Sequence, residues 1–134
     1  MTRGLGKLQR DLLEILEEST EKLSTITLAA IAYRVQPDEI GFRGINDAQH
    51  VAVRRALRGL YKRGLVTELG RRRHRDNRRY WASLKVGLPE RLEELRFFSR
   101  GFAVRSSPTK AAEVRAEMIE IQERIKQLGI APTR

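Results

Sequence analysis

The sequence predicts a mainly helical fold with one small β-hairpin, an α+β arrangement, in a chain of 134 residues. Two observations predict this class. Apolar residues recur at steps of three and four in five segments, which is the spacing of amphipathic helices. After the third of these segments come two short runs rich in β-branched and aromatic residues, separated by a polar turn. Because 40% of the residues are apolar, the chain can bury a core.

The N-terminal third predicts two helices and a long turn. The first helix is expected at 5–17, where leucines and isoleucines form one face and acidic residues the other. Residues 24–26 are expected to be extended, and Thr27 is placed as the N-cap of a second helix at 28–34. Proline and glycine then break the pattern, so residues 35–45 are expected to form a long turn.

The third helix, expected at about 46–62, has the most regular pattern. Asn46 or Asp47 can cap its start, and Gly64 follows its end. Its inner stripe contains Val53, Ala56, Leu57 and Leu60. The opposite, polar side is expected to carry Gln49, His50, Arg54, Arg55 and Arg58.

The predicted hairpin pairs a strand at 65–69 with an antiparallel strand at 79–84. The link at 70–78 holds five arginines and an Asp-Asn turn dipeptide. Strand alternation directs one of Tyr80 and Trp81 into the core, so packing within the sheet is the favoured role for this pair over stacking on a ligand's rings.

The C-terminal part is expected to be a helical extension, dividing the chain into domains at 1–86 and 87–134. Pro89 is placed at the start of a short helix. Residues 97–105, with three phenylalanines, are taken as a linker, with a partner-binding patch as the alternative.

The last predicted helix, 108–128, carries an apolar stripe over about three heptads. Two alternatives follow: the stripe covers the chain's own domain, or it pairs two chains. A homodimer is favoured, with an antiparallel arrangement preferred because Glu117 would then face Arg124 of the second copy. The stripe consists of Val114, Met118, Ile121, Ile125 and Leu128.

The net charge of +10 is concentrated in one segment. Residues 54–85 contain twelve lysines and arginines against two acidic residues, and the rest of the chain is electrically neutral. Clustered arginine and lysine gain affinity for polyanions by releasing counterions. We therefore expect a polyanion partner, for which the clustered candidates include Arg54, Arg55, Arg58, Arg71, Arg72, Arg73, Arg75, Arg78 and Arg79.

Several function classes are disfavoured. The chain has no cysteine and two histidines that no carboxylate cluster accompanies, so neither a metal site nor a cofactor is expected. No nucleophile is paired with a base and no glycine-rich phosphate loop is present, so an enzyme is not expected. Apolar runs are too short to span a bilayer and the N-terminus does not resemble a signal peptide, so a cytoplasmic, nucleoid-associated location is expected.

Residues 48–66, and within them the run Ala-Leu-Arg-Gly-Leu-Tyr-Lys-Arg-Gly-Leu-Val at 56–66, resemble the recognition helix and first wing strand of winged helix-turn-helix proteins. The resemblance covers about residues 5–84 and places the family's wing at 70–79. It implies binding of double-stranded DNA, with base contacts from Asp47, Gln49, His50 and Arg54. By the same resemblance, Arg55, Arg58 and the wing arginines would contact phosphates or the minor groove. The turn at 35–45 departs from the family, whose turn is usually three or four residues.

A transcriptional regulator is the function that this resemblance favours. One alternative is a DNA-binding component of a phage or plasmid packaging, replication or partition assembly. A second, less favoured, is an RNA- or ribosome-binding protein, because arginine-rich hairpins also recognise RNA shape.

Overall fold

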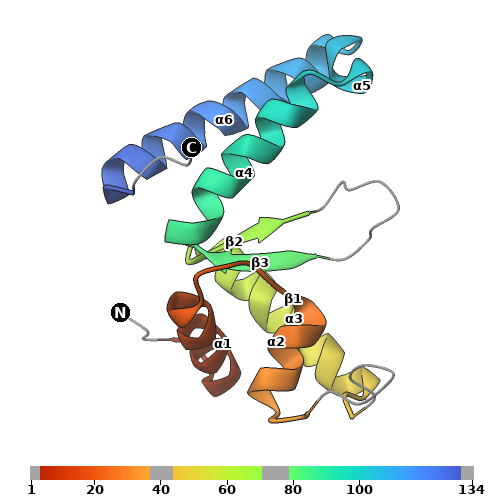
Figure 1. Cartoon of the computed structure of the whole chain (residues 1–134), viewed down its shortest axis with the longest axis vertical. Coiled ribbons are helices and arrows are strands. Elements are labelled where there is room, and N and C mark those ends of the chain that lie inside the picture. The colour runs from red at the N-terminus through yellow and green to blue at the C-terminus, as the bar shows by residue number, and fades with distance from the viewer. Residues whose placement is uncertain (1–3, 37–43, 71–78, 131–134) are drawn as a thin grey trace.

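A computed structural model describes residues 4–36, 44–70 and 79–130. Within these ranges the chain is mainly helical with a small antiparallel sheet, which confirms the predicted α+β class (Figure 1). The elements in chain order are α1 (Lys7–Glu18), β1 (Leu23–Ser24), α2 (Thr25–Ala32), α3 (Asp47–Lys62), β2 (Val66–Leu69), β3 (Tyr80–Ser83), α4 (Leu84–Ser99), α5 (Phe102–Arg105) and α6 (Pro108–Leu128).

The sheet has the order β1-β3-β2, with β3 between the other two strands. The predicted hairpin is confirmed, since β2 and β3 pair antiparallel with Val66 opposite Ser83 and Leu69 opposite Tyr80. The short β1 pairs with the other edge of β3. In Figure 1 the sheet lies between the α1–α3 group and the α4–α6 pair, so it connects the two helical parts.

The first hydrophobic cluster is formed by α1, α2 and α3 against the sheet, and Trp81 is its largest member. The Trp81 side chain is fully buried, and its indole N–H donates to the Thr25 hydroxyl at 2.8 Å. One of Tyr80 and Trp81 was expected to enter the core, and alternation along β3 directs Trp81 there. Tyr80 is half-buried, and the Lys22 ammonium lies 5.1 Å from its ring centroid.

The expected start of the second helix was wrong by three residues. Helix α2 begins at Thr25, and its N-cap is Ser24, whose side-chain oxygen accepts a hydrogen bond from the Thr27 backbone N–H. Serine is the better N-cap of the two residue types, and Ser24 also ends the extended segment, where it pairs with Tyr80 in the sheet.

Pro89 does not start a helix, contrary to the prediction. Helix α4 follows β3 directly, because the Ser83 side chain caps it by accepting from the Val86 N–H. Pro89 lies inside α4, where it removes the hydrogen bond that its backbone N–H would make to Lys85. The predicted domain boundary between residues 86 and 87 therefore falls inside this helix.

Gly87 brings α4 close to the sheet. A Cβ atom added at Gly87 would lie 2.4 Å from the Thr67 Cβ of β2, so any side chain there would push the helix away. The close approach of Gly87 to Thr67 packs α4 directly on β2.

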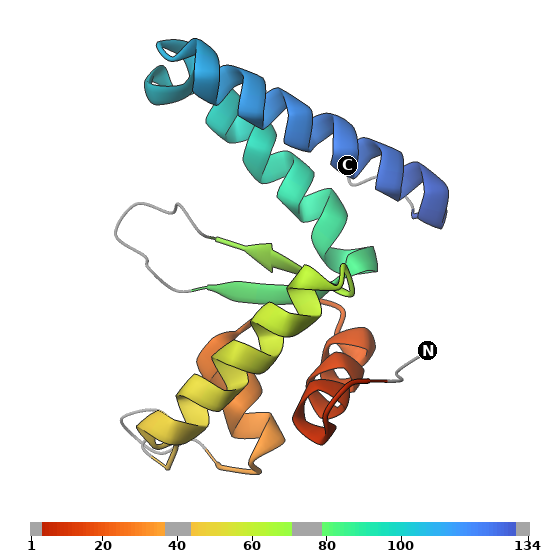
Figure 2. The same cartoon turned by 180° about the vertical axis from the view of Figure 1, so that it is seen from behind.

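The segment 97–105 is not a linker. Helix α4 continues to Ser99, α5 follows, and Val104 is buried in a second hydrophobic cluster. The cluster lies between α4 and α6, which run side by side in both views (Figures 1 and 2).

The apolar stripe of α6 packs on α4 of the same chain. Val114 and Ile121 are buried there, Met118 and Ile125 pack against the same cluster, and Leu128 is half exposed. This is the alternative in which the helix covers its own domain. Since four of the five residues are covered within one chain, the favoured homodimer through this stripe has no structural support.

Among the described residues no helix is long and apolar enough to cross a membrane.

Candidate nucleic-acid interface

Helix α3 presents an arginine face because its other face is held in the core. Val53, Leu57 and Leu60 are fully buried, and Arg54, Arg55 and Arg58 are exposed on the side away from them. Gly64, with φ of 73°, terminates the helix in the left-handed conformation that favours glycine. The helix thus has the predicted bounds and the predicted outward arginines.

These three arginines share a hollow with a fourth from the sheet. Arg54, Arg55, Arg58 and Arg79 line a cleft of about 340 Å³. Arg79 immediately precedes β3, so the cleft joins the exposed face of α3 to the base of the hairpin. Since all four described residues that line it are arginines, the cleft concentrates positive charge.

Arg79 is also part of a structural ion pair. Its Nη1 donates to Glu68 Oε2 at 2.9 Å, and the Glu68 side chain is 5% exposed whereas that of Arg79 is 40% exposed. The pair joins β2 to the start of β3 and fixes where the arginine projects. Sequence analysis assigned Arg79 to nucleic acid alone and did not predict this second role.

Gln49 and His50 do not share the exposed arginine face. Both are half-buried, and the Gln49 side chain completes a capping box at the start of α3. Its Oε1 accepts from the Asn46 N–H at 3.1 Å, and Asn46 Oδ1 accepts from the Gln49 N–H at 2.8 Å. A glutamine three residues after an asparagine cap folds back onto the helix start in this way. Contact of Gln49 and His50 with nucleic acid stays a prediction.

The remaining predicted contacts, Arg71, Arg72, Arg73, Arg75 and Arg78, lie outside the described residues. Their contact with nucleic acid stays a prediction from the sequence, in which they directly precede Arg79.

Sequence analysis missed a buried ionic cluster beneath the hairpin. Arg91 of α4 pairs with Glu94 at 3.0 Å and with Glu117 of α6 at 2.8 Å. Glu94 Oε2 also accepts from the backbone N–H of Gly70 at 3.0 Å. Gly70 follows β2 and precedes the arginine-rich segment, so the cluster ties the base of the hairpin to the helical pair.

Arg91 is held in its charged form by this cluster. Burial alone would lower the pKa of Arg91, but hydrogen bonds and charge from Glu117 and Glu94 outweigh burial and raise the pKa above its ordinary value. Alternating charges along a helix usually indicate a solvated surface, so no local pattern predicts that Arg91 and Glu94 are buried.

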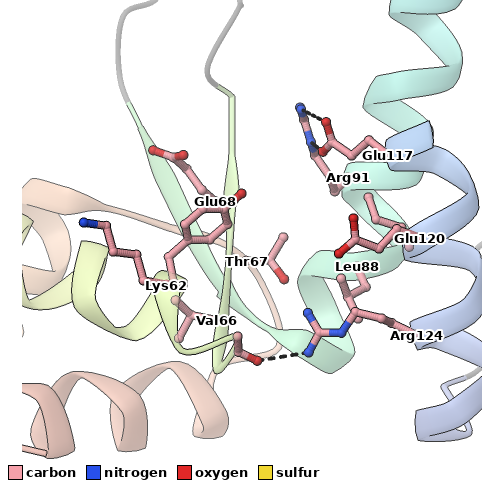
Figure 3. A pocket seen from close by; sticks show the side chains of 12 residues that line it. Lys62, Val66, Thr67, Glu68, Leu88, Arg91, Glu117, Glu120 and Arg124 are labelled. Carbon is pink, nitrogen blue, oxygen red and sulfur yellow. Dashed lines mark hydrogen bonds and ion pairs between the residues drawn. The ribbon is translucent and has the colours of Figure 1, made fainter. Parts of the chain in front are cut away.

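A cavity of about 350 Å³ lies beside this cluster, between β2 and the α4–α6 pair (Figure 3). Arg124 points across it and donates to the carbonyl oxygen of Gly64 at 3.0 Å. The Thr67 hydroxyl is buried on its wall, where it has no hydrogen-bond partner among the described residues. Opposite charges line the cavity in similar numbers, so its chemistry favours no single ligand class.

Comparisons with protein-family models, with curated protein sequences and with solved structures found no match for this chain.

Proposed function

We propose that this chain binds double-stranded DNA, with α3 in the major groove, and acts as a transcriptional regulator. The observation that carries the proposal is the cleft lined by Arg54, Arg55, Arg58 and Arg79. Arg54, Arg55 and Arg58 are exposed, and Arg79 beside them keeps 40% of its side chain exposed while it pairs with Glu68. Such a cluster matches a phosphate backbone, since arginine pairs with phosphate oxygens through a planar, bidentate donor fork.

The arrangement of elements supports docking of α3 as a recognition helix. In winged helix-turn-helix proteins a shorter helix precedes the recognition helix and a hairpin follows it, and here α2 precedes α3 and the β2–β3 hairpin follows. The major groove of B-DNA admits one α-helix. The face of α3 opposite its buried stripe is polar and exposed, so it is available to enter the groove. We assign this chain to the winged helix architecture on that basis, with residues 70–79 as the wing.

The contacts divide into two kinds. Arg55, Arg58 and Arg79, together with the arginines at 71–78, would bind phosphates or the narrow minor groove. Arg54, nearer the start of α3, would contact a base edge. Gln49 is a weaker base-reading residue than the sequence implied, because its Oε1 is engaged in the helix cap.

Competition between two polyanions tests the proposal against RNA binding. We would titrate a labelled random-sequence DNA duplex bound to the chain with unlabelled duplex or with a structured RNA hairpin, at matched salt. We expect duplex DNA to displace the probe at concentrations at least about tenfold lower than RNA, since a helix enters the wide major groove of B-DNA and not the deep, narrow one of A-form RNA. Stronger displacement by RNA would overturn the assignment to DNA.

A further inference from the structure

Two exposed aromatic side chains lie at the end of the helical pair farthest from the sheet. Phe97 is 73% exposed and Phe102 is 85% exposed, the highest values for large apolar side chains among the described residues. They flank the turn from α4 to α5 (Figure 1). Such a patch on a soluble domain usually marks an interaction site. We call the segment 96–105 the tip.

The tip is positively charged. Between Arg96 and Lys110 the sequence has no acidic residue. Arg96 pairs with Glu93, whereas Arg100 and Arg105 are exposed and have no ion-pair partner among the residues that the structure describes. A partner of the tip should therefore combine an apolar surface with acidic side chains.

A groove with those two properties lies elsewhere on the same chain. It has a volume of about 630 Å³, is lined by mainly apolar surface, and runs between the end of α1 and the start of α4. Three of the described residues that line it are charged, Glu17, Glu18 and Lys85, so their net charge is negative. Glu17 and Glu18 are exposed and have no ion-pair partner in the described part of the chain. Its apolar wall consists of Leu13, Leu65, Leu84 and Val86.

The two surfaces belong to opposite ends of α4, so one chain cannot bring them together. Val86 lies in the first turn of α4 and Phe97 in its last. Eleven residues of helix separate them by about 16 Å along the axis. Figure 2 shows α5 and the start of α4 at opposite ends of the helix.

We propose that the tip of one molecule docks into this groove on a second copy of the chain. Phe97 and Phe102 would enter the apolar wall, and Arg100 and Arg105 would face Glu17 and Glu18. The contact joins two different surfaces, so each molecule keeps one free tip and one free groove. Repeated in one direction, a contact of this kind builds rings or filaments.

The inference stands independently of DNA binding, because neither surface includes an arginine of the α3 cleft. If both proposals hold, neighbouring molecules on DNA would bind cooperatively, which is the behaviour of the assembly proteins that the sequence left as an alternative.

Sedimentation velocity of the full chain without DNA tests the contact. We expect the mass of the wild-type chain to rise with concentration beyond that of a dimer. The tip variant Phe97→Ser/Phe102→Ser and the groove variant Glu17→Lys/Glu18→Lys should each raise the dissociation constant at least about tenfold. The first removes the aromatic anchors, and the second places lysines against Arg100 and Arg105. All four side chains are exposed, so folding should be preserved.

Mixing the two variants gives the sharper result. The tip variant keeps an intact groove and the groove variant keeps an intact tip, so an equimolar mixture should form a 1:1 dimer that grows no further. Ile119→Ser serves as the control, since Ile119 is an exposed apolar residue of α6 outside both surfaces. The proposal is overturned if the wild type stays monomeric up to about 1 mM, the weak end of association. Unchanged association in both variants, a mixture that fails to pair, or loss of association in Ile119→Ser would also overturn it.

Discussion

Replacing Arg91 with methionine is expected to lower the free energy of unfolding by about 3–5 kcal/mol. In the described part of the chain, Arg91 is the only cation that forms an ion pair with Glu94, and the side chain of Glu94 is 7% exposed. Without the guanidinium, that carboxylate stays buried with its charge unpaired. Urea denaturation followed by circular dichroism measures the loss.

Two further variants separate charge burial from simple loss of packing. Arg91→Met/Glu94→Gln removes both charges but keeps an oxygen that can accept from the Gly70 N–H, so it should recover most of the stability. Arg96→Met breaks the exposed pair with Glu93 and should cost about 1 kcal/mol or less. Equal losses in Arg91→Met and Arg96→Met would show that the ionic cluster does not stabilise the fold.

The triple variant Arg54→Ala/Arg55→Ala/Arg58→Ala is expected to bind duplex DNA about a hundredfold more weakly or worse. Each lost contact removes a charge-assisted hydrogen bond to DNA. If Arg55 and Arg58 contact phosphates and Arg54 contacts a base edge, the slope of log K against log salt should become shallower by about 1.8, at about 0.9 for each phosphate contact. Stability should change little, because all three side chains are exposed.

A second triple variant controls for total charge. Arg10→Ala/Arg115→Ala/Lys126→Ala removes the same three positive charges from exposed sites on α1 and α6. It should retain nearly all of the affinity and the slope. Equal weakening by both variants would mean that overall charge, and not the α3 face, binds the DNA.

The sequence predicted α3 and the hairpin well because several local signals agree there. The buried stripe at Val53, Leu57 and Leu60, the cap at Asn46 and the stop at Gly64 all specify the same helix. The exposed positions of Arg54, Arg55 and Arg58 follow directly from that stripe.

Other features depend on contacts between distant segments, which no local pattern reveals. Pro89 looked like a helix start, but the Ser83 cap begins α4 directly from the sheet. The cluster of Arg91, Glu94 and Glu117 forms only because α4 and α6 pack together, and the pairing of Arg79 with Glu68 requires the hairpin to close. The capping role of Gln49 was not predicted, because capping and base contact use the same polar atoms at the start of a helix.

A salt titration of wild-type binding to a random-sequence DNA duplex tests the central proposal most directly. If Arg55, Arg58 and Arg79 contact phosphates as proposed, log K should fall linearly with log salt with a slope of about −2.7, and more steeply if the arginines at 71–78 also contact the backbone. No binding at low salt, or a slope near zero, would contradict a DNA-binding role for this surface.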